Sequence, residues 1–387
     1  VRPTILILHS TPSTKIAIAM FTPISGLGGG ALIGASAGTL LLFNGNVLGT
    51  AGICHSSIIS LKNTFCDSKE NWKLAFIASF LITSKIIVNI VGVNDLIDPA
   101  VGTNPDLAIV SALGHGVAGF LVGIGTRIGN GCTTGHGICG LARLSKRSLV
   151  AVLTFMSTGV FSATMCSPLC PLAKYLRTNA DAVQYALPTS LSENVGSIIM
   201  ALFIAAAIPA LLRLNSKNRK DGEDDDNSNS VRKLFPAALS GSLFSLGLYI
   251  SKMAMSSKIY GFLDMKGFSR GTYDATLALV MGGGLLTSWL SYQFVKGFNV
   301  IKNDHALSCP LALKKSSGKF QVPTSQVIDF KLVFGEALFG LGWGIGGICP
   351  GPAMFLAAAG FPHLLFRWWP GYIAGTYLGE KIKGLMA

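Results

Sequence analysis

Reactive side chains are concentrated in one glycine-rich stretch, residues 123–144, which reads GIGTRIGNGCTTGHGICGLARL. Its centre holds four residues with thiol, hydroxyl or imidazole groups: Cys132, Thr133, Thr134 and His136. Groups of these kinds can donate hydrogen bonds to an anion. Six glycines between residues 123 and 137 remove side chains and let the backbone leave helical geometry. We therefore expect a break in an apolar helix, with polar groups presented at the break.

A second copy of this pattern lies near the C-terminus, at residues 340–360, with the sequence GLGWGIGGICPGPAMFLAAAG. Aligned on Cys132 and Cys349, both copies read G-x-G-x-x-x-G-x-x-C. Pro350 and Pro352 suit the first turn of a helix, where a missing N–H costs little. Two such breaks, each flanked by apolar helix, predict one site shared between two halves of a membrane protein.

A half-helix that begins just after each cysteine would direct free amides into a polar cavity. Because the start of a helix carries roughly half a positive charge, two such ends attract an anion. Arg127 lies inside the first break and needs a partner, which either Glu336 or the anion could supply. The candidate binding residues are Cys132, Cys349, Cys54, Thr133, Thr134, His136, Gly131, Gly135, Gly351 and Arg127.

The alternative is that the glycines only allow helices to approach closely. We favour that interpretation for the G-x-x-x-G-x-x-x-G run from Gly371 to Gly379. At the two breaks we favour a ligand site, because close packing does not require a cysteine at the same place in both copies.

The composition indicates a membrane protein. Of 387 residues, 50% are hydrophobic and only 13% are charged, and the mean hydropathy is +0.53. A soluble domain carries about 25% charged residues. The net charge of +13 could suggest nucleic acid, but the basic residues lie in short loops between apolar runs, where they act as orientation signals. Nucleic acid is therefore not an expected partner, and the lipid bilayer is.

The predicted fold is an all-α polytopic membrane protein with about nine transmembrane helices plus re-entrant half-helices, arranged as two inverted repeats. The predicted crossings are 30–48, 72–93, 108–125, 149–165, 195–214, 234–251, 275–295, 332–348 and 364–378. A short segment around Cys54 is too short to span and is predicted to be re-entrant. The predicted divisions are an N-terminal lead at 1–27, a first membrane repeat at 28–214, a charged linker at 215–233 and a second membrane repeat at 234–387.

Charge bias predicts the orientation. The loops at 61–73, 143–148, 213–233 and 296–331 share one side in this scheme and hold most of the basic residues. By the positive-inside rule that side is cytoplasmic. The loop at 94–106 carries aspartates and no basic residue. We expect a multi-pass protein of the plasma (inner) membrane with its N-terminus outside and its C-terminus in the cytoplasm.

The eight cysteines do not suggest a disulfide framework, because this is not a small secreted chain. Cys66, Cys139 and Cys309 are interpreted as structural, while Cys166 and Cys170 leave an outer disulfide open. Cys132, His136 and Cys139 have a metal-like C-x3-H-x2-C spacing, but zinc normally takes four ligands. We therefore expect neither a metal nor a cofactor. The chain lacks a G-x-x-x-x-G-K-[ST] loop, so ATP-driven action is not expected.

Three ordered motifs resemble the YeeE/YedE family of sulphur transporters, whose characterised members import thiosulfate: GNGCTTGHGICGLARLSKRSL, GFLD followed by LALVMGGGLL, and FGLGWGIGGICPGPA. The resemblance implies an hourglass-shaped bundle in which cysteine thiols pass thiosulfate, or a related sulphur anion, through a narrow centre. It places Cys132 and Cys349 in that relay. The family's third cysteine lies in an R-x-C-F-like stretch after the first span. Asn46 to Gly49 stand there in this chain, and Cys54, a few residues later, is the candidate replacement.

The expected function is thus import of a small sulphur-containing anion, without enzymatic chemistry, with a cytoplasmic sulphur-carrier protein as a candidate partner. Thiols are weak donors, and a conducted species must bind loosely enough to leave. Transport of another sulphur or selenium species is one alternative. The other is a membrane-embedded sulphurtransferase, in which Cys132 or Cys349 would hold sulphur as a persulfide. His136 is the only nearby candidate for the base that such chemistry requires.

Overall fold

The computed structural model describes residues 21–59, 70–91, 110–165, 176, 226–270, 273–301, 306–313, 319–360 and 364–386. Within these residues every regular element is helical, and the β-structure is limited to two isolated bridges. The predicted all-α class is therefore confirmed for the described part of the chain.

Two series of helices follow one another along the chain. The first consists of α1 (Pro23–Thr39), its continuation η1 (Leu40–Asn44), α2 (Thr50–Ile59), α4 (Asn71–Val91), α6 (Ala112–Gly129), η3 (Thr133–Gly140) and α7 (Lys146–Met165). The second consists of α10 (Asp226–Ile250), α11 (Ser256–Leu263), α12 (Gly267–Arg270), α13 (Thr276–Tyr292), α14 (Phe330–Gly346), α15 (Pro350–Ala359), η4 (Leu364–Trp368) and α16 (Trp369–Leu385).

Five stretches of the described residues are long and apolar enough to cross a membrane: Pro23–Asn44, Asn71–Val91, Lys146–Met165, Lys233–Ile250 and Phe330–Ala359. The chain is therefore a multi-pass membrane protein. Among the described residues the structure thus supports five of the nine predicted crossings by length and composition. Segment 195–214 lies outside the described residues. α13 and α16 are each only 17 residues long, and α16 also carries Glu380, Lys381 and Lys383.

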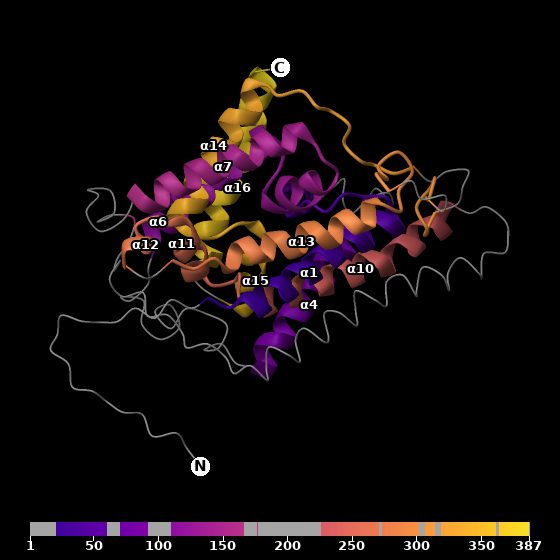
Figure 1. The fold of residues 1–387 in the computed structure, drawn as a ribbon, viewed down its shortest axis with the longest axis horizontal. Coiled ribbons are helices and arrows are strands. Elements are labelled where there is room, and N and C mark those ends of the chain that lie inside the picture. The colour runs from indigo at the N-terminus through magenta and orange to yellow at the C-terminus, as the bar shows by residue number, and fades with distance from the viewer. Residues whose placement is uncertain are drawn as a thin grey trace, which may run out of the picture.

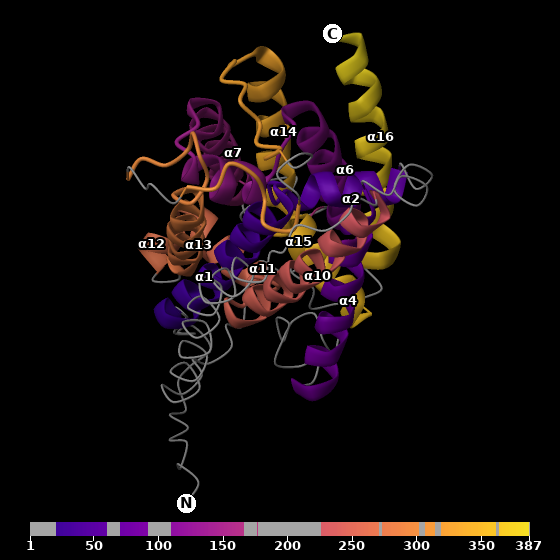
Figure 2. The ribbon, with the colours of Figure 1, turned by 90° about the vertical axis from the view of Figure 1, so that its right-hand side faces the viewer.

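The helices pack in two rows. One row runs α13, α1, α10, α4, and the other runs α7, α14, α6, α16, with each helix in contact with the next. In Figure 1 the first row fills the lower part of the molecule, and α7, α14 and α16 lie above it. The short helix η3 contacts α7 of one row and α13 of the other. The short helix α15 contacts α4 and α10 of the first row, and Trp369 of α16 in the second row donates to its Ala353 carbonyl oxygen at 3.3 Å. Figure 2 shows the same two groups from the side. Both short helices are thus held between the rows.

Glycines allow the second row to pack closely, and this corrects one interpretation of the sequence. Gly123 and Gly125 do not unwind the chain but lie inside α6. A Cβ atom on Gly125 would lie 2.3 Å from the backbone nitrogen of Phe339, and one on Gly123 would lie 2.4 Å from the carbonyl oxygen of Tyr372. Their role is close helix contact. The packing role predicted for Gly371, Gly375 and Gly379 is confirmed, because a Cβ atom on each would lie within 3.0 Å of an atom of α6.

The true breaks are short and equivalent. α6 ends at Asn130 and α14 ends at Gly347, both with a φ of 63° in the left-handed region. Asparagine and glycine adopt this conformation more readily than other residues, and it commonly ends a helix. In each copy the left-handed residue lies two positions before the cysteine. The backbone therefore turns in the same way at both breaks.

Helical structure extends into two segments that the sequence assigned to the lead and to the linker. Residues 226–232, which the sequence assigned to the charged linker, are helical and begin α10. Residues 23–27 of the predicted lead are helical too, because Pro23 occupies the first position of α1, where proline is favoured. Residues 215–225 and 1–20 lie outside the described part.

A buried ion pair ties the start of α13 to α11. Lys258 Nζ lies 2.8 Å from Asp274 Oδ2, and both side chains are only 2% exposed. The same ammonium group donates to Thr22 Oγ1 at 3.1 Å, which connects the pair to α1. Asp274 Oδ1 also accepts the Thr276 amide at 2.8 Å. One buried pair therefore fixes three elements at this end of the first row.

We expect Asp274→Asn to lower the unfolding free energy by about 3–5 kcal/mol, because it leaves the Lys258 charge buried without its counter-ion. The double variant Lys258→Met/Asp274→Asn should recover part of that loss, since no buried charge then remains. Thermal unfolding in detergent would measure both. A double variant no more stable than the single one would show that the pair contributes little.

Candidate functional site

Cys132 stands between α6 and a short helix that follows it directly. Its backbone is extended, with a φ of −154°. The next eight residues, Thr133–Gly140, are wound as a π-helix, and the His136 amide donates to the Cys132 carbonyl oxygen at 2.9 Å. The half-helix expected after this cysteine is therefore present.

Cys349 occupies the same place in the second break. Its backbone is extended, with a φ of −111°, and Pro350 begins α15. The two breaks meet here, because the hydroxyl of Thr133 donates to the Cys349 sulphur at 3.7 Å. The residue directly after one cysteine thus contacts the other cysteine.

A third short helix, α2, completes the centre. Thr50 Oγ1 lies 3.6 Å from Cys132 Sγ and 3.4 Å from Thr134 Oγ1. One turn later, Cys54 Sγ lies 3.4 Å from Met354 Sδ of α15. A row of thiol and hydroxyl groups therefore joins α2, η3 and α15. The segment around Cys54, predicted to be short and re-entrant, is this ten-residue helix.

A cavity of about 600 Å³ opens against one side of this centre and is rich in positive charge. Gly131, Cys132, Gly135 and His136 lie in its wall. Its basic lining residues are Lys73, Arg127, Arg143, Arg147, Lys331 and Lys383, against the acidic Glu70 and Asp329. A cleft lined by one sign of charge attracts ions of the opposite sign. We refer to it as the basic cavity.

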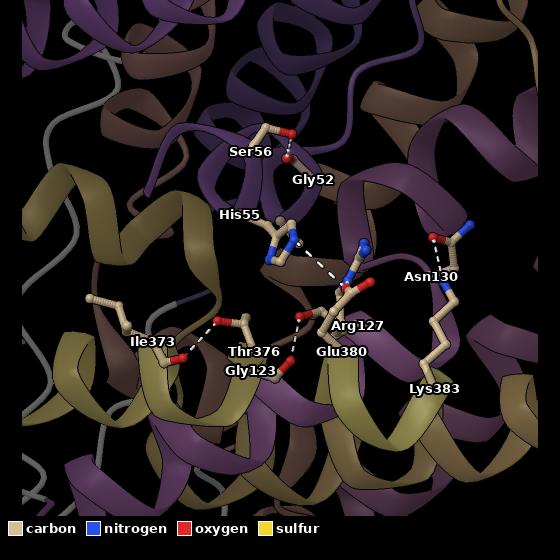
Figure 3. Close-up of polar contacts among 12 residues, drawn as sticks. Gly52, His55, Ser56, Gly123, Arg127, Asn130, Ile373, Thr376, Glu380 and Lys383 are labelled. Carbon is tan, nitrogen blue, oxygen red and sulfur yellow. Dashed lines mark hydrogen bonds and ion pairs between the residues drawn. The ribbon is translucent and has the colours of Figure 1, made fainter. Parts of the chain in front are cut away.

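An ion pair lies beside the basic cavity (Figure 3). Arg127 of α6 binds Glu380 of α16 through its Nε atom, and His55 of α2 lies 3.9 Å from the same carboxylate oxygen. Lys383 reaches Asn130 in the same region, at 3.4 Å. Of the two partners that the sequence left open for Arg127, Glu336 is excluded by the structure, because α16 packs along α6 and supplies the Glu380 carboxylate instead.

A second cavity of about 320 Å³ lies beyond the thiols and is almost entirely apolar. Phe155, Phe244 and Trp343 line it, together with three polar residues: Thr133, Thr134 and Cys349. We refer to it as the apolar cavity. Of these two cavities, Cys132 lines the basic one and Cys349 lines the apolar one. The contact between the two breaks is therefore the partition between the two cavities.

Three glycines were predicted to belong to the site. A Cβ atom on Gly131 would lie 2.1 Å from the His136 ring, and one on Gly351 would lie 3.0 Å from the ring of Phe244. A Cβ atom on Gly135 would meet nothing within 4 Å. Gly131 and Gly351 therefore make room for neighbouring rings, whereas Gly135 borders open space.

His136 is held by two neighbours that the sequence did not connect with it. Its Nδ1 atom lies 3.0 Å from Ser148 Oγ, and its Nε2 atom lies 3.4 Å from Glu336 Oε1. Both ring nitrogens therefore face side chains other than the Cys132 thiol. This arrangement does not provide the base that persulfide chemistry would need.

Sequence reasoning also missed Thr50 and most of the basic lining. The four-residue spacing of Thr50 and Cys54 is a helical signal, since such residues share one face. It could have marked Thr50 once the segment was treated as a helix. The basic residues come from five separate stretches of the chain. Nothing in their local sequence indicates that they meet.

The described cysteines are free thiols, as expected: Cys54, Cys132, Cys139, Cys309 and Cys349. Cys66, Cys166 and Cys170 lie outside the described residues. Cys139 turns its thiol to the Leu48 carbonyl oxygen, at 3.4 Å. In the part of the chain that the structure covers, no three His, Cys, Asp or Glu side chains gather as a metal site would require.

Known proteins resemble parts of this chain. Residues 232–385 match a protein family described as a family of unknown function (DUF6691). A protein of Xylella fastidiosa strain 9a5c, named "Probable transporter", is 34% identical over 147 residues, which are 38% of this chain and 88% of that protein. Another of that name, from strain Temecula1, is 32% identical over 136 residues, 35% of this chain and 81% of that protein. The chain belongs to the family of these Xylella proteins.

Members of this family can be much shorter than the present chain. The 147 matched residues make up 88% of the first relative but only 38% of this chain. That relative is therefore less than half as long as this chain. A member of this family can therefore be about as long as one of the two helix series of this chain.

We expect two glycines of the first break to respond differently to the same change. Gly131→Ala should lower the unfolding free energy by about 1–3 kcal/mol, because the added methyl overlaps the His136 ring. The matched variant Gly135→Ala should stay within about 0.5 kcal/mol of the parent, since it meets open space. Thermal unfolding in detergent compares them, and equal losses would contradict the described position of His136.

Proposed function

We propose that this protein is a membrane transporter that imports a small sulphur-containing anion, most simply thiosulfate, past Cys132 and Cys349. One observation carries the proposal: the two cysteines face opposite cavities and are linked through Thr133 at the partition between them. The names of the Xylella relatives support transport. The YeeE/YedE-like motifs support the choice of thiosulfate.

The packing of the helices supports two equivalent repeats, and their inversion relative to each other is part of the proposal. α1, α4, α6, η3 and α7 correspond in order to α10, α13, α14, α15 and α16. Under this correspondence the contact of α1 with α13 becomes that of α10 with α4, and both occur. The contact of α16 with α6 likewise becomes that of α7 with α14. The first Xylella relative is less than half as long as this chain, and a length of that size corresponds to one repeat. Nine crossings remain part of the proposal.

The partition suits weak, successive contacts with an anion. Thr50, Cys132, Thr133 and Cys349 offer hydroxyl and thiol donors in a row. The half-helices η3 and α15 begin immediately after the two cysteines, so their positive ends point at the same place. A thiol donor is weak, so it can hold a soft sulphur terminus and release it again. Neither contact requires the anion to change chemically.

The direction of transport follows from the basic cavity. It is lined by residues from 143–147 and 321–331 and by Lys383 near the end of α16. The positive-inside rule assigns basic loops to the cytoplasm. An imported anion would then pass from the apolar cavity to the basic one. In this scheme the N-terminus lies outside, and a cytoplasmic sulphur-carrier protein would receive the anion.

The relay can be tested by initial thiosulfate uptake into proteoliposomes with matched protein content. Cys132→Ser and Cys349→Ser should each slow uptake at least about tenfold, which needs only about 1.4 kcal/mol at the limiting barrier. Serine keeps the size but replaces a soft donor with a harder one. The matched control is Cys139→Ser, a buried thiol of the same short helix that faces Leu48 instead.

Alanine variants complete the test. Cys132→Ala and Cys349→Ala should insert and purify normally yet fail in uptake, since each removes one thiol donor from the row at the partition. Cys54→Ala should reduce uptake less, because the Cys54 sulphur faces Met354 and lines neither cavity. Parental rates in both of the first two variants would end the relay proposal.

Transport is separated from sulphur transfer by following both sulphur atoms. If Cys132 attacked the outer sulphur of thiosulfate, the S–S bond would break, a persulfide would form and sulphite would leave. We expect thiosulfate labelled on either sulphur to accumulate inside vesicles as the intact ion, since neither His136 nitrogen faces the thiol. Sulphite released outside, with labelled sulphur left on the protein, would favour the sulphurtransferase.

A further inference from the structure

Glu336 is a charged residue that is fully buried in the described core. It lies in α14 with 0% exposure, and neither of its carboxylate oxygens has a hydrogen-bond partner among the described residues. Among the described residues, the nearest basic side-chain nitrogen is His136 Nε2, which lies 3.4 Å from Glu336 Oε1. An ionised carboxylate without partners in the interior of a protein costs several kcal/mol. The arrangement therefore calls for a proton in or next to this carboxylate.

Two helices packed against α14 bring one glycine, two paired arginines and one serine to this region. α6 presents Gly129 to the carboxylate, since a Cβ atom there would lie 2.7 Å from Glu336 Oε1. The nearest arginine of α6, Arg127, is bound to Glu380. α7 contributes Arg147, which pairs with Asp329 at 3.2 Å, and Ser148, which holds the His136 ring.

The remaining contacts of α14 are distant from the carboxylate. α11 meets α14 at its other end, where Tyr260 donates to the Ile345 carbonyl oxygen. Its charged residue Lys258 is bound to Asp274. Lys331 and Asp329 lie at the start of α14 and line the basic cavity, together with Arg143 of the first break. The group closest to Glu336 is therefore His136, and the pair must be treated together.

The pair is directly connected to the predicted anion path. His136 lies in the wall of the basic cavity, and its amide donates to the Cys132 carbonyl oxygen at 2.9 Å. Gly131, one residue before Cys132, lacks a side chain where the His136 ring lies. A change in the charge or position of the His136 ring therefore alters the surroundings of Gly131 and Cys132 in the first break.

We propose that Glu336 and His136 form a proton-binding site whose occupation allows an anion to pass Cys132. The proton is shared between His136 Nε2 and a Glu336 carboxylate oxygen, and it exchanges with water of the basic cavity, in whose wall His136 lies. With one proton the pair is neutral as a whole. Without it, a negative charge lies beside the cysteine and repels the anion. Anion and proton then favour each other's binding, and this coupling is reciprocal.

This inference rests on the proposed transport function, so its test has two independent readouts. The first is thiosulfate uptake by the full chain in proteoliposomes, measured in buffers from mildly acidic to mildly alkaline. Uptake by the parent should fall about tenfold or more as pH rises. Glu336→Gln, which is neutral at every pH, should flatten this dependence.

The matched control is Glu380→Gln, which makes the same change at the carboxylate that is paired with Arg127 and lies near His55. This variant should keep the steep fall with pH. An equal pH dependence in the parent and in Glu336→Gln would overturn the proposal. A flat profile in the parent would do the same.

The second readout is infrared difference spectroscopy of the parent protein without thiosulfate. Titration should reveal a buried carboxylic acid C=O band that disappears as pH rises and is missing in Glu336→Gln. Added thiosulfate should shift the disappearance to higher pH. If the parent has no titrating band, the proton site is wrong, whether or not the variant folds. A titrating band without thiosulfate uptake at any pH would instead leave the proton site standing and refute thiosulfate transport.

Discussion

The rest of the structure depends on one constraint, which is that non-helical backbone cannot face lipid. Unpaired backbone groups in hydrocarbon cost several kcal/mol each, so broken helices survive at membrane depth only where protein or water surrounds them. Here the break at Gly347 is buried in protein, and the break at Asn130 borders the basic cavity. The close glycine contacts between α6, α14 and α16 bring one row tightly together. The enclosure that makes the breaks tolerable also forms the two cavities beside them.

The two cavities differ in the way they would treat an ion. The basic cavity offers several cations, whereas the apolar cavity offers aromatic rings with only hydroxyl and thiol groups at its inner end. In the proposed transporter an anion would lose water on the apolar side and regain polar partners on the basic side. The barrier to passage would then lie at Cys349 rather than at Cys132. This asymmetry arises although both breaks have the same backbone turn.

The sequence allowed much of the fold to be predicted but less of the site. Hydropathy and the repeated G-x-G-x-x-x-G-x-x-C pattern were sufficient to locate the helices, the two breaks and the half-helices, because these depend on local composition. The expected loss of helical geometry at Gly123 and Gly125 was wrong, because the backbone atoms that leave no room for a side chain there belong to α14 and α16. The pairing of Arg127 with Glu380 and of Glu336 with His136 joins residues about 200 or more positions apart. Contacts between residues so far apart in the sequence are set by helix packing, so the local sequence does not indicate them.

The free thiols at the partition make the protein sensitive to oxidation. A thiol that is oxidised to a sulfenic or sulfinic acid gains oxygen atoms, polarity and, in the higher state, negative charge. At Cys349 such an adduct would disrupt the contact with Thr133, and at Cys132 it would lie directly beside that contact. In a transporter built on this plan, oxidants would close the path without unfolding the protein. Reductants that reach the basic cavity could reopen it after the first oxidation step. The availability of sulphur to the cell would then follow the redox state of the compartment that the basic cavity faces.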